Sequence, residues 1–231
     1  MKILGIIPAR GGSKGVKGKN IKNLAGSPLI SYTIKEAMKS NLTNVIVSTD
    51  DDEISKVARN FGADVPFKRP EDLSNDTAKS IDVAVHALIE FEKIKGISYD
   101  AIMLLQPTTP FRTFEDINSA IKLINENLEA DSVISVVDVK AHHPARMKYL
   151  QNGWLIDPPF CEVTENQNRQ ELQPMYIRNG AIYLTRKKTL LSKSYKGEKC
   201  LAYEMPEERS ANIDNLHDFD YAEWLYTKYL K

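Results

Sequence analysis

Apolar segments of strand length alternate with amphipathic segments of helical length along most of this 231-residue chain. The apolar segments contain few polar residues, which is typical of parallel strands that are covered on both faces. This alternation predicts one α/β domain, a three-layer structure in which helices cover both faces of a doubly wound, mostly parallel sheet. Ligands bind such sheets beyond the carboxyl ends of the strands. The predicted strands cover residues 3–8, 45–47, 64–67, 99–105, 132–137, 179–184 and 201–203.

Polar residues that can cap a helix stand before the amphipathic segments. Ser27 caps the first predicted helix with Pro28 at its first position, and Thr113 caps the fourth. Residues 73–77 are expected to cap the third and longest helix. The predicted helices cover residues 28–40, 53–61, a long segment after 77, 114–128 and a closing segment from 216.

Residues 140–177 break this alternation and show no sustained periodicity. A segment of this length is too long for an ordinary loop inside a compact domain. It contains Trp154, Ile156 and Phe160, which have no core of their own, so we expect a second copy of the chain to cover them. The sequence therefore predicts a homodimer of single domains spanning residues 1–231, with residues 140–177 as an insert.

The composition excludes several classes of partner. Lysine plus arginine and aspartate plus glutamate each number 31, so no global field attracts nucleic acid or a membrane. The two cysteines, Cys161 and Cys200, are far apart and predict neither a disulfide framework nor a zinc site. No apolar run approaches membrane-spanning length, and Pro8 interrupts the first strand before it could form a signal-peptide core. We therefore expect a cytoplasmic protein with a small anionic substrate.

The first predicted strand leads into a loop, residues 9–20, with four glycines and four cations. Glycines let backbone N–H groups close on an anion, and the cations supply charge that a triphosphate could neutralise. The loop is therefore predicted to bind nucleotide phosphates. It matches neither the P-loop nor the dinucleotide fingerprint, which disfavours the alternative of a dinucleotide-dependent oxidoreductase. The cations are Arg10, Lys14, Lys17 and Lys19.

The motif Pro8-Ala-Arg10-x-x-Ser13-Lys14-Gly15, followed by Lys19-Asn20, resembles the opening signature of the CMP-sialic acid synthetases, or N-acylneuraminate cytidylyltransferases. The resemblance returns at four later motifs and covers nearly the whole chain. It implies a fold of the nucleotide-diphospho-sugar transferase type, in which residues 140–177 pack against a second subunit. It also implies that Arg10, Ser13, Lys14, Lys19 and Asn20 hold the phosphates and the cytosine end of CTP.

Two further motifs extend the predicted nucleotide site. Arg69-Pro-Glu-Asp-Leu-Ser-Asn-Asp-Thr77 with Ser80 resembles a family motif whose arginine and serine contact the nucleotide and the sugar acid, although a helix cap with solvated charges also explains it. Gln106-Pro-Thr-Thr-Pro-Phe-Arg112 closely resembles another family motif. Its two prolines directly follow a buried strand, so they predict an extended ledge that aims the Gln106 amide into the cleft, toward nucleotide and sugar acid.

The sugar acid is expected to meet arginines and a tyrosine. Arg146 and Arg169 are candidates because guanidinium groups bind a carboxylate in a bidentate manner. Arg169 lies in Asn-Arg-Gln, which resembles a Pro-Arg-Gln segment of the family, and a charge on a dimer surface is its alternative role. Asn179-Gly-Ala-Ile-Tyr183 matches a family motif, and Tyr183 is predicted to form a wall of the sugar pocket.

The metal site is expected near the end of the chain. Arg209-Ser-Ala-Asn-Ile-Asp214 resembles a family segment in which Asp-Ile-Asp holds magnesium, and Asn212 replaces the first aspartate here. Mg²⁺ prefers oxygen ligands and keeps several waters, so an amide oxygen or a water can replace one carboxylate. Asp214 is the main predicted metal ligand and Asn212 is the second. The expected ion is Mg²⁺, with Mn²⁺ as an alternative.

The resemblance implies transfer of CMP from CTP to the anomeric hydroxyl of a nonulosonic (sialic-type) acid of nine carbons. Arg10, Lys14, Lys19 and Mg²⁺ would position the phosphates and neutralise their charge, without a covalent protein intermediate. The sequence identifies no general base, and N-acetylneuraminate and legionaminate-type acids both remain open. The alternatives are a non-catalytic nucleotide-binding protein of the same fold and a cytidylyltransferase for another acidic sugar, such as Kdo.

Overall fold

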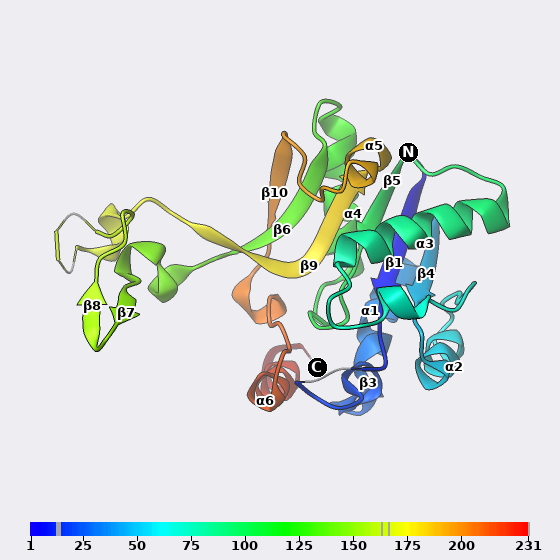
Figure 1. The fold of residues 1–231 in the computed structure, drawn as a ribbon, viewed down its shortest axis with the longest axis horizontal. Helices are drawn as coiled ribbons and strands as arrows, with labels where there is room; N and C mark the ends of the chain where they lie inside the picture. Colours follow the sequence, from blue (N-terminus) through cyan, green and yellow to red (C-terminus); the bar gives the residue numbers. More distant parts are fainter. Residues whose placement is uncertain (13–14, 163, 166, 231) are drawn as a thin grey trace.

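A computed structural model describes residues 1–12, 15–162, 164–165 and 167–230. In this part of the chain the central sheet has six strands in the order β10-β6-β9-β5-β1-β4 (Figure 1). Strand β1 lies parallel to β4 and β5, and β10 lies parallel to β6. The mostly parallel sheet is therefore confirmed. The strands are β1 (Ile3–Pro8), β4 (Asn44–Ser48), β5 (Ala101–Leu104), β6 (Ser132–Asp138), β9 (Tyr176–Arg186) and β10 (Cys200–Glu204).

Strand β9 departs from the parallel pattern, because it pairs antiparallel with both β5 and β6. The segment at 64–67, predicted as a strand, makes only isolated bridges at Asp64 and Lys68. Pro66 lies between them and has no N–H to donate to a ladder, which explains why a regular strand does not form. A two-stranded ribbon of β2 (Asn23–Leu24) and β3 (Ser27–Pro28) follows the first loop.

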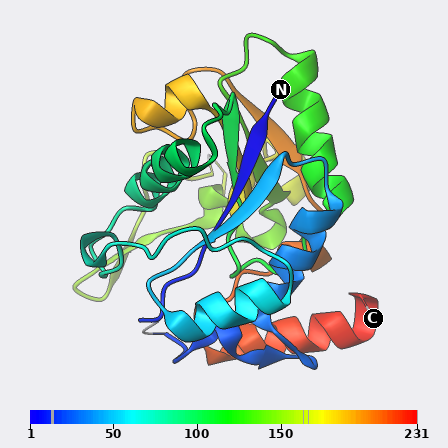
Figure 2. The same ribbon diagram turned by 90° about the vertical axis from the view of Figure 1, so that its right-hand side faces the viewer.

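Helices cover both faces of the sheet, as the two views show (Figures 1 and 2). Each face of the sheet has its own hydrophobic core, and the side chains of β1 point into both. Ile3 and Ile7 pack in the core on one face, and Leu4 and Ile6 pack in the core on the other. The helices are α1 (Leu29–Lys39), α2 (Asp52–Asn60), α3 (Ser80–Lys95), α4 (Phe114–Glu126), α5 (Lys187–Leu191) and α6 (Leu216–Leu225), followed by a π-helical turn, Tyr226–Leu230.

The helix starts confirm one predicted cap and correct two others. Thr113 forms a capping box with Asp116 at the start of α4, as predicted for this threonine. Helix α1 begins one residue later than expected, with Pro28 at its N-cap. Helix α3 begins at Ser80, because the Asn75 side chain accepts hydrogen bonds from the backbone N–H groups of Thr77 and Ala78 and closes a separate turn.

Residues 140–177, here called the arm, project from the body of the molecule (Figure 1). The arm contains a hairpin of β7 (Tyr149–Gln151) and β8 (Trp154–Ile156), all six residues of which are exposed. The hairpin was not predicted, although its turn, Asn152-Gly153, has positive φ at both residues, as a type I′ turn requires. Short 3₁₀ helices cover Lys19–Ile21, Glu71–Leu73, Lys140–His142, Pro144–Arg146, Arg169–Glu171 and Glu207–Arg209.

Candidate active site

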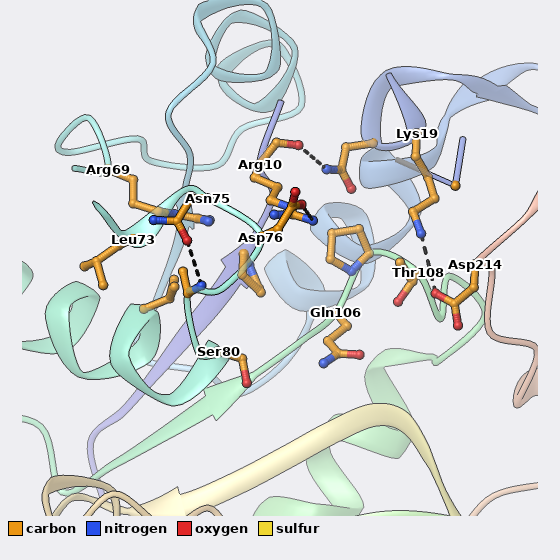
Figure 3. Close-up of a pocket in the computed structure, with 16 residues that line it drawn as sticks. Arg10, Lys19, Arg69, Leu73, Asn75, Asp76, Ser80, Gln106, Thr108 and Asp214 are labelled. Atoms are coloured by element: carbon orange, nitrogen blue, oxygen red, sulfur yellow. Dashed lines mark hydrogen bonds and ion pairs between the residues drawn. The ribbon is translucent and has the colours of Figure 1, made fainter. Parts of the chain in front are cut away.

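A cavity of about 460 Å³ lies at the carboxyl ends of β1 and β5, where the strand pattern predicts a ligand. The first loop, the segment before α3, the ledge after β5 and the segment before α6 form its walls (Figure 3). Seven of the predicted site residues line this cavity, namely Arg10, Lys19, Asn20, Arg69, Ser80, Gln106 and Asp214.

The backbone of the first loop is fixed by hydrogen bonds at its start. The Asn20 side chain is buried, and its amide nitrogen donates to the Arg10 carbonyl over 3.0 Å. Further along, Gly15 passes so close to Asp214 that a Cβ on the glycine would lie 2.1 Å from the Asp214 carbonyl oxygen. Glycine is therefore required at position 15 to let the loop meet the Asp214 segment. Ser13 and Lys14, both predicted to bind phosphate, lie outside the described residues.

Two cations and two carboxylates form ion pairs in the cavity (Figure 3). Arg10 Nη2 lies 2.9 Å from Asp76 Oδ1. Lys19 Nζ lies 3.6 Å from Asp214 Oδ1 and donates to the Ile213 carbonyl over 2.7 Å. The Arg10 guanidinium and the Lys19 ammonium therefore face the same cavity and can bind the anionic groups of one ligand.

Arg69 lies between the cavity and the end of β4. Its guanidinium is buried and donates to the Ser48 hydroxyl over 3.1 Å and to the Ser48 carbonyl. Burial, and to a lesser extent the nearby Arg10, lowers the pKa of Arg69 to about 10, while Asp50 opposes the shift. Arg69 remains charged at neutral pH and adds a third positive charge to the wall of the cavity.

Gln106 begins the predicted ledge and rests against β9. Its Oε1 lies 3.0 Å from the position that a Cβ on Gly180 would occupy, and Gly180 has a φ of 80°. A side chain at Gly180 would be strained and would also displace Gln106. The Thr109 hydroxyl donates to the Asn179 carbonyl over 3.1 Å, which ties the ledge to the same strand.

The predicted metal ligands adjoin the ledge, because the Ile213 N–H donates to the Thr108 carbonyl. Asp214 is 70% exposed, and Asn212 Nδ2 donates to its Oδ2 over 2.6 Å. The described residues contain no cluster of three or more His, Cys, Asp or Glu suited to a metal. Asp214 would hold Mg²⁺ through its exposed carboxylate, which suits an ion that keeps several waters. In this arrangement the Asn212 amide nitrogen orients the Asp214 carboxylate.

Among the residues predicted to bind the sugar acid, Gln106 lines the cavity, whereas Tyr183 and Arg146 do not. Tyr183 is half-buried on β9 and packs against Tyr195, with ring centroids 5.4 Å apart. Arg146 lies in the arm, where its Nη2 donates to the Gln167 carbonyl over 3.0 Å. The arm extends from the body (Figure 1), and Arg146 is not among the residues that line the cavity of its own chain. The side chain of Arg169 lies outside the described residues.

Asn75, Asp76 and Thr108 also line the cavity, although no role was predicted for them from the sequence. Asn75 and Asp76 lie in a polar run that was interpreted as a helix cap, and only the late start of α3 places them in the wall. Thr108 lies inside the predicted ledge, two residues after Gln106, so its place in this motif could have indicated that it lines the cavity.

Comparison with known proteins identifies the family. A family model described as cytidylyltransferase matches residues 4–223. The chain belongs to the cytidylyltransferase family. This cytidylyltransferase is 37% identical over 203 residues to the CMP-N,N′-diacetyllegionaminic acid synthase of Legionella pneumophila. The alignment covers 86% of this chain and 84% of that protein.

It is also 36% identical over 223 residues to the N-acylneuraminate cytidylyltransferase of Escherichia coli, an alignment that covers 96% of this chain but 51% of the relative. This chain thus spans about half the length of the N-acylneuraminate cytidylyltransferases that it matches. Among solved structures, the CMP-2-keto-3-deoxy-manno-octonic acid synthetase complexed with CTP superposes with a TM-score of 0.74 and covers 100% of both chains. At 16% identity this likeness confirms the fold.

Proposed function

We propose that this cytidylyltransferase transfers CMP from CTP to the anomeric hydroxyl of a nonulosonic acid of the sialic or legionaminic type. The observation that carries the proposal is the polar cavity at the ends of β1 and β5, where Arg10, Lys19, Arg69, Gln106 and Asp214 meet. Relatives that align with most of this chain include a CMP-N,N′-diacetyllegionaminic acid synthase and an N-acylneuraminate cytidylyltransferase.

In the proposed reaction the sugar hydroxyl oxygen attacks the α-phosphorus of CTP. A new oxygen–phosphorus bond forms and the hydroxyl proton is released to water, while the bond from the α-phosphorus to the bridging oxygen breaks and pyrophosphate leaves with that oxygen. Arg10 and Lys19 neutralise the negative charge that grows on the phosphates as this bond breaks. To do so, Arg10 exchanges its contact with Asp76 for the triphosphate, whose total negative charge exceeds that of one carboxylate.

We propose that Arg69 and Ser80 serve the nucleoside end, because they line the cavity wall away from Asp214 (Figure 3). Gln106 lies between the two ends and can donate to either substrate through its amide nitrogen. The proposed Mg²⁺ would be held by Asp214 and would neutralise phosphate charge. The Lys19 ammonium group restrains Asp214 in two ways: it pairs with the Asp214 carboxylate and donates a hydrogen bond to the carbonyl of the preceding residue, Ile213.

We also propose a homodimer formed through the arm. Trp154, Leu155 and Leu150 are each about three-quarters exposed, and a two-stranded hairpin buries too little surface to be stable alone. A second copy that covers these side chains removes a large apolar surface from water. If Arg146 binds the sugar carboxylate, as the sequence predicts, it does so at the cavity of the partner chain.

A cytoplasmic location is part of the proposal. Cys161 and Cys200 are both free thiols, which suits a reducing compartment. In the described residues no helix combines the length and the apolar character needed to cross a bilayer.

A turnover assay with a panel of acids tests the proposed activity. The purified protein is incubated with CTP, Mg²⁺ and N-acetylneuraminate, N,N′-diacetyllegionaminate or Kdo, and CMP-sugar is detected by mass spectrometry. We expect CMP-sugar and pyrophosphate in equal amounts with a nine-carbon acid. CTP binding without product from any nonulosonic acid would contradict the proposal and favour a non-catalytic nucleotide-binding protein.

A further inference from the structure

Arg112 is a buried cation beneath the ledge and makes no contact with the cavity. Its side chain is 1% exposed, which is unusual for arginine. It does not line the cavity, since the ledge that begins at Gln106 separates it from the ligand space. A buried guanidinium is stable only if its N–H groups find acceptors, so its partners indicate what it holds together.

The guanidinium joins both ends of the ledge to two other elements. Nη2 donates to the carbonyls of Gln106 and Thr109. Nε donates to the Ala181 carbonyl of β9 over 2.8 Å, and Nη1 donates to the Thr33 hydroxyl of α1 over 2.7 Å. One planar group therefore fixes the ledge relative to a strand and a helix.

These contacts do not include an ion pair that would explain Arg112 as a simple charge partner. Asp116, the carboxylate whose charge acts on Arg112, is bound by Arg209 through two hydrogen bonds of 2.7 and 3.2 Å. Burial lowers the pKa of Arg112 to about 9, so the group stays charged at neutral pH. The chain thus keeps a costly buried charge where its hydrogen bonds are all to neutral acceptors.

We propose that Arg112 is a positioning residue for Gln106: it fixes the ledge so that the Gln106 amide is held against Gly180 and aimed into the cavity. The proposal rests on the function proposed above, because it assigns Arg112 to the same reaction. Lysine cannot replace it, since a single ammonium cannot span acceptors on the ledge, β9 and α1 at once. Misplacement of a contacting group by about 1 Å can cost a hundredfold in rate.

The first test measures the ledge without any reaction. Hydrogen exchange is followed by mass spectrometry in wild type, Arg112→Lys and Thr33→Val, which removes one acceptor and keeps the arginine. We expect faster exchange of peptides spanning residues 105–113 in both variants, more in Arg112→Lys. Arg186→Lys is the matched control, because Arg186 also donates to two backbone carbonyls, those of Ala130 and Ile124, at the opposite end of β9. It should leave the ledge unchanged.

The second test is a double-mutant cycle with Gln106→Ala, measured as kcat/KM for the acid used most efficiently in the panel. Arg112→Lys alone should lower kcat/KM by about a hundredfold, whereas Arg112→Lys in the Gln106→Ala background should lower it little further. Coupling of this kind is expected only if Arg112 acts through Gln106. Equal effects in both backgrounds would overturn the proposal, as would unchanged exchange of the ledge in Arg112→Lys.

The two tests separate this inference from the proposed function. If the wild type turns over no acid, the proposed function fails. The exchange experiment then decides whether Arg112 fixes the ledge: an unchanged ledge overturns that role, and a loosened ledge in Arg112→Lys but not in Arg186→Lys supports it.

Discussion

Arg10 is the residue on which the proposed phosphate site most depends. Arg10→Ala removes a charge-assisted contact to a polyanion, so we expect kcat/KM for CTP to fall at least tenfold, or about 1.4 kcal/mol in transition-state stabilisation. Lys17→Ala is a matched control, because Lys17 lies in the same loop but is exposed and does not line the cavity. A loss below tenfold in Arg10→Ala, or an equal loss in Lys17→Ala, would argue against a phosphate site formed by the first loop.

Asn212 and Asp214 allow a test of the metal site by thermal stability as well as by turnover. Asn212 Nδ2 donates to Asp214, so Asn212→Asp replaces a hydrogen bond by two adjacent carboxylates. We expect Asn212→Asp to be less stable without metal and to gain more in Tm on addition of Mg²⁺ than the wild type. Asp214→Asn should show no Mg²⁺-dependent gain and should lose magnesium-dependent turnover. Equal Mg²⁺ responses in all three proteins would remove Asp214 from the site.

At the scale of elements, Asp116 connects the start of α4 to Arg209, which precedes the predicted metal ligands Asn212 and Asp214. Burial raises the pKa of Asp116, but hydrogen bonds from Arg209, Thr113 and Tyr203 outweigh this effect and hold the pKa below its usual value. The folded state therefore gains stability from the ionised group above the unfolded pKa of about 3.9 and loses it as the pH falls through the lower, folded pKa.

Urea unfolding between pH 3 and pH 7 measures this contribution. The free energy of unfolding should fall more steeply below about pH 4 in the wild type than in Asp116→Asn, which has no carboxyl group to titrate. Identical pH profiles for the two proteins would show that Asp116 does not connect the elements in this way.

Local signals explain which elements could be predicted. The cap at Thr113 was predicted because it depends only on neighbouring residues. The same holds for the apolar strands β1, β5 and β6. The antiparallel direction of β9 depends on pairing with residues about eighty positions away in β5, which no local pattern encodes. Arg10 and Gln106 belong to motifs that directly follow strands, whereas Arg69, Ser80 and Asp214 were found through their resemblance to family motifs. Asp76 was missed because its turn resembles a helix cap.

At the scale of the whole molecule, the arm predicts the oligomeric state. Light scattering should give about twice the 26.1 kDa of one chain at micromolar concentration. Trp154→Glu places a charge in the exposed apolar surface and should yield a monomer that remains folded, because Trp154 contributes nothing to the described cores. Leu128→Glu, at an exposed leucine outside the arm, is the control and should stay dimeric. A monomeric wild type would contradict the dimer.

The path of one oxygen atom tests the central claim most directly. The acid that is turned over is first equilibrated in ¹⁸O-water, which labels its anomeric hydroxyl, and then converted with CTP and Mg²⁺. Attack of that hydroxyl on the α-phosphorus predicts ¹⁸O in the bond between sugar and phosphate of the CMP-sugar and none in pyrophosphate. Label in pyrophosphate, or a CMP-sugar whose bridging oxygen comes from CTP, would contradict the proposed reaction.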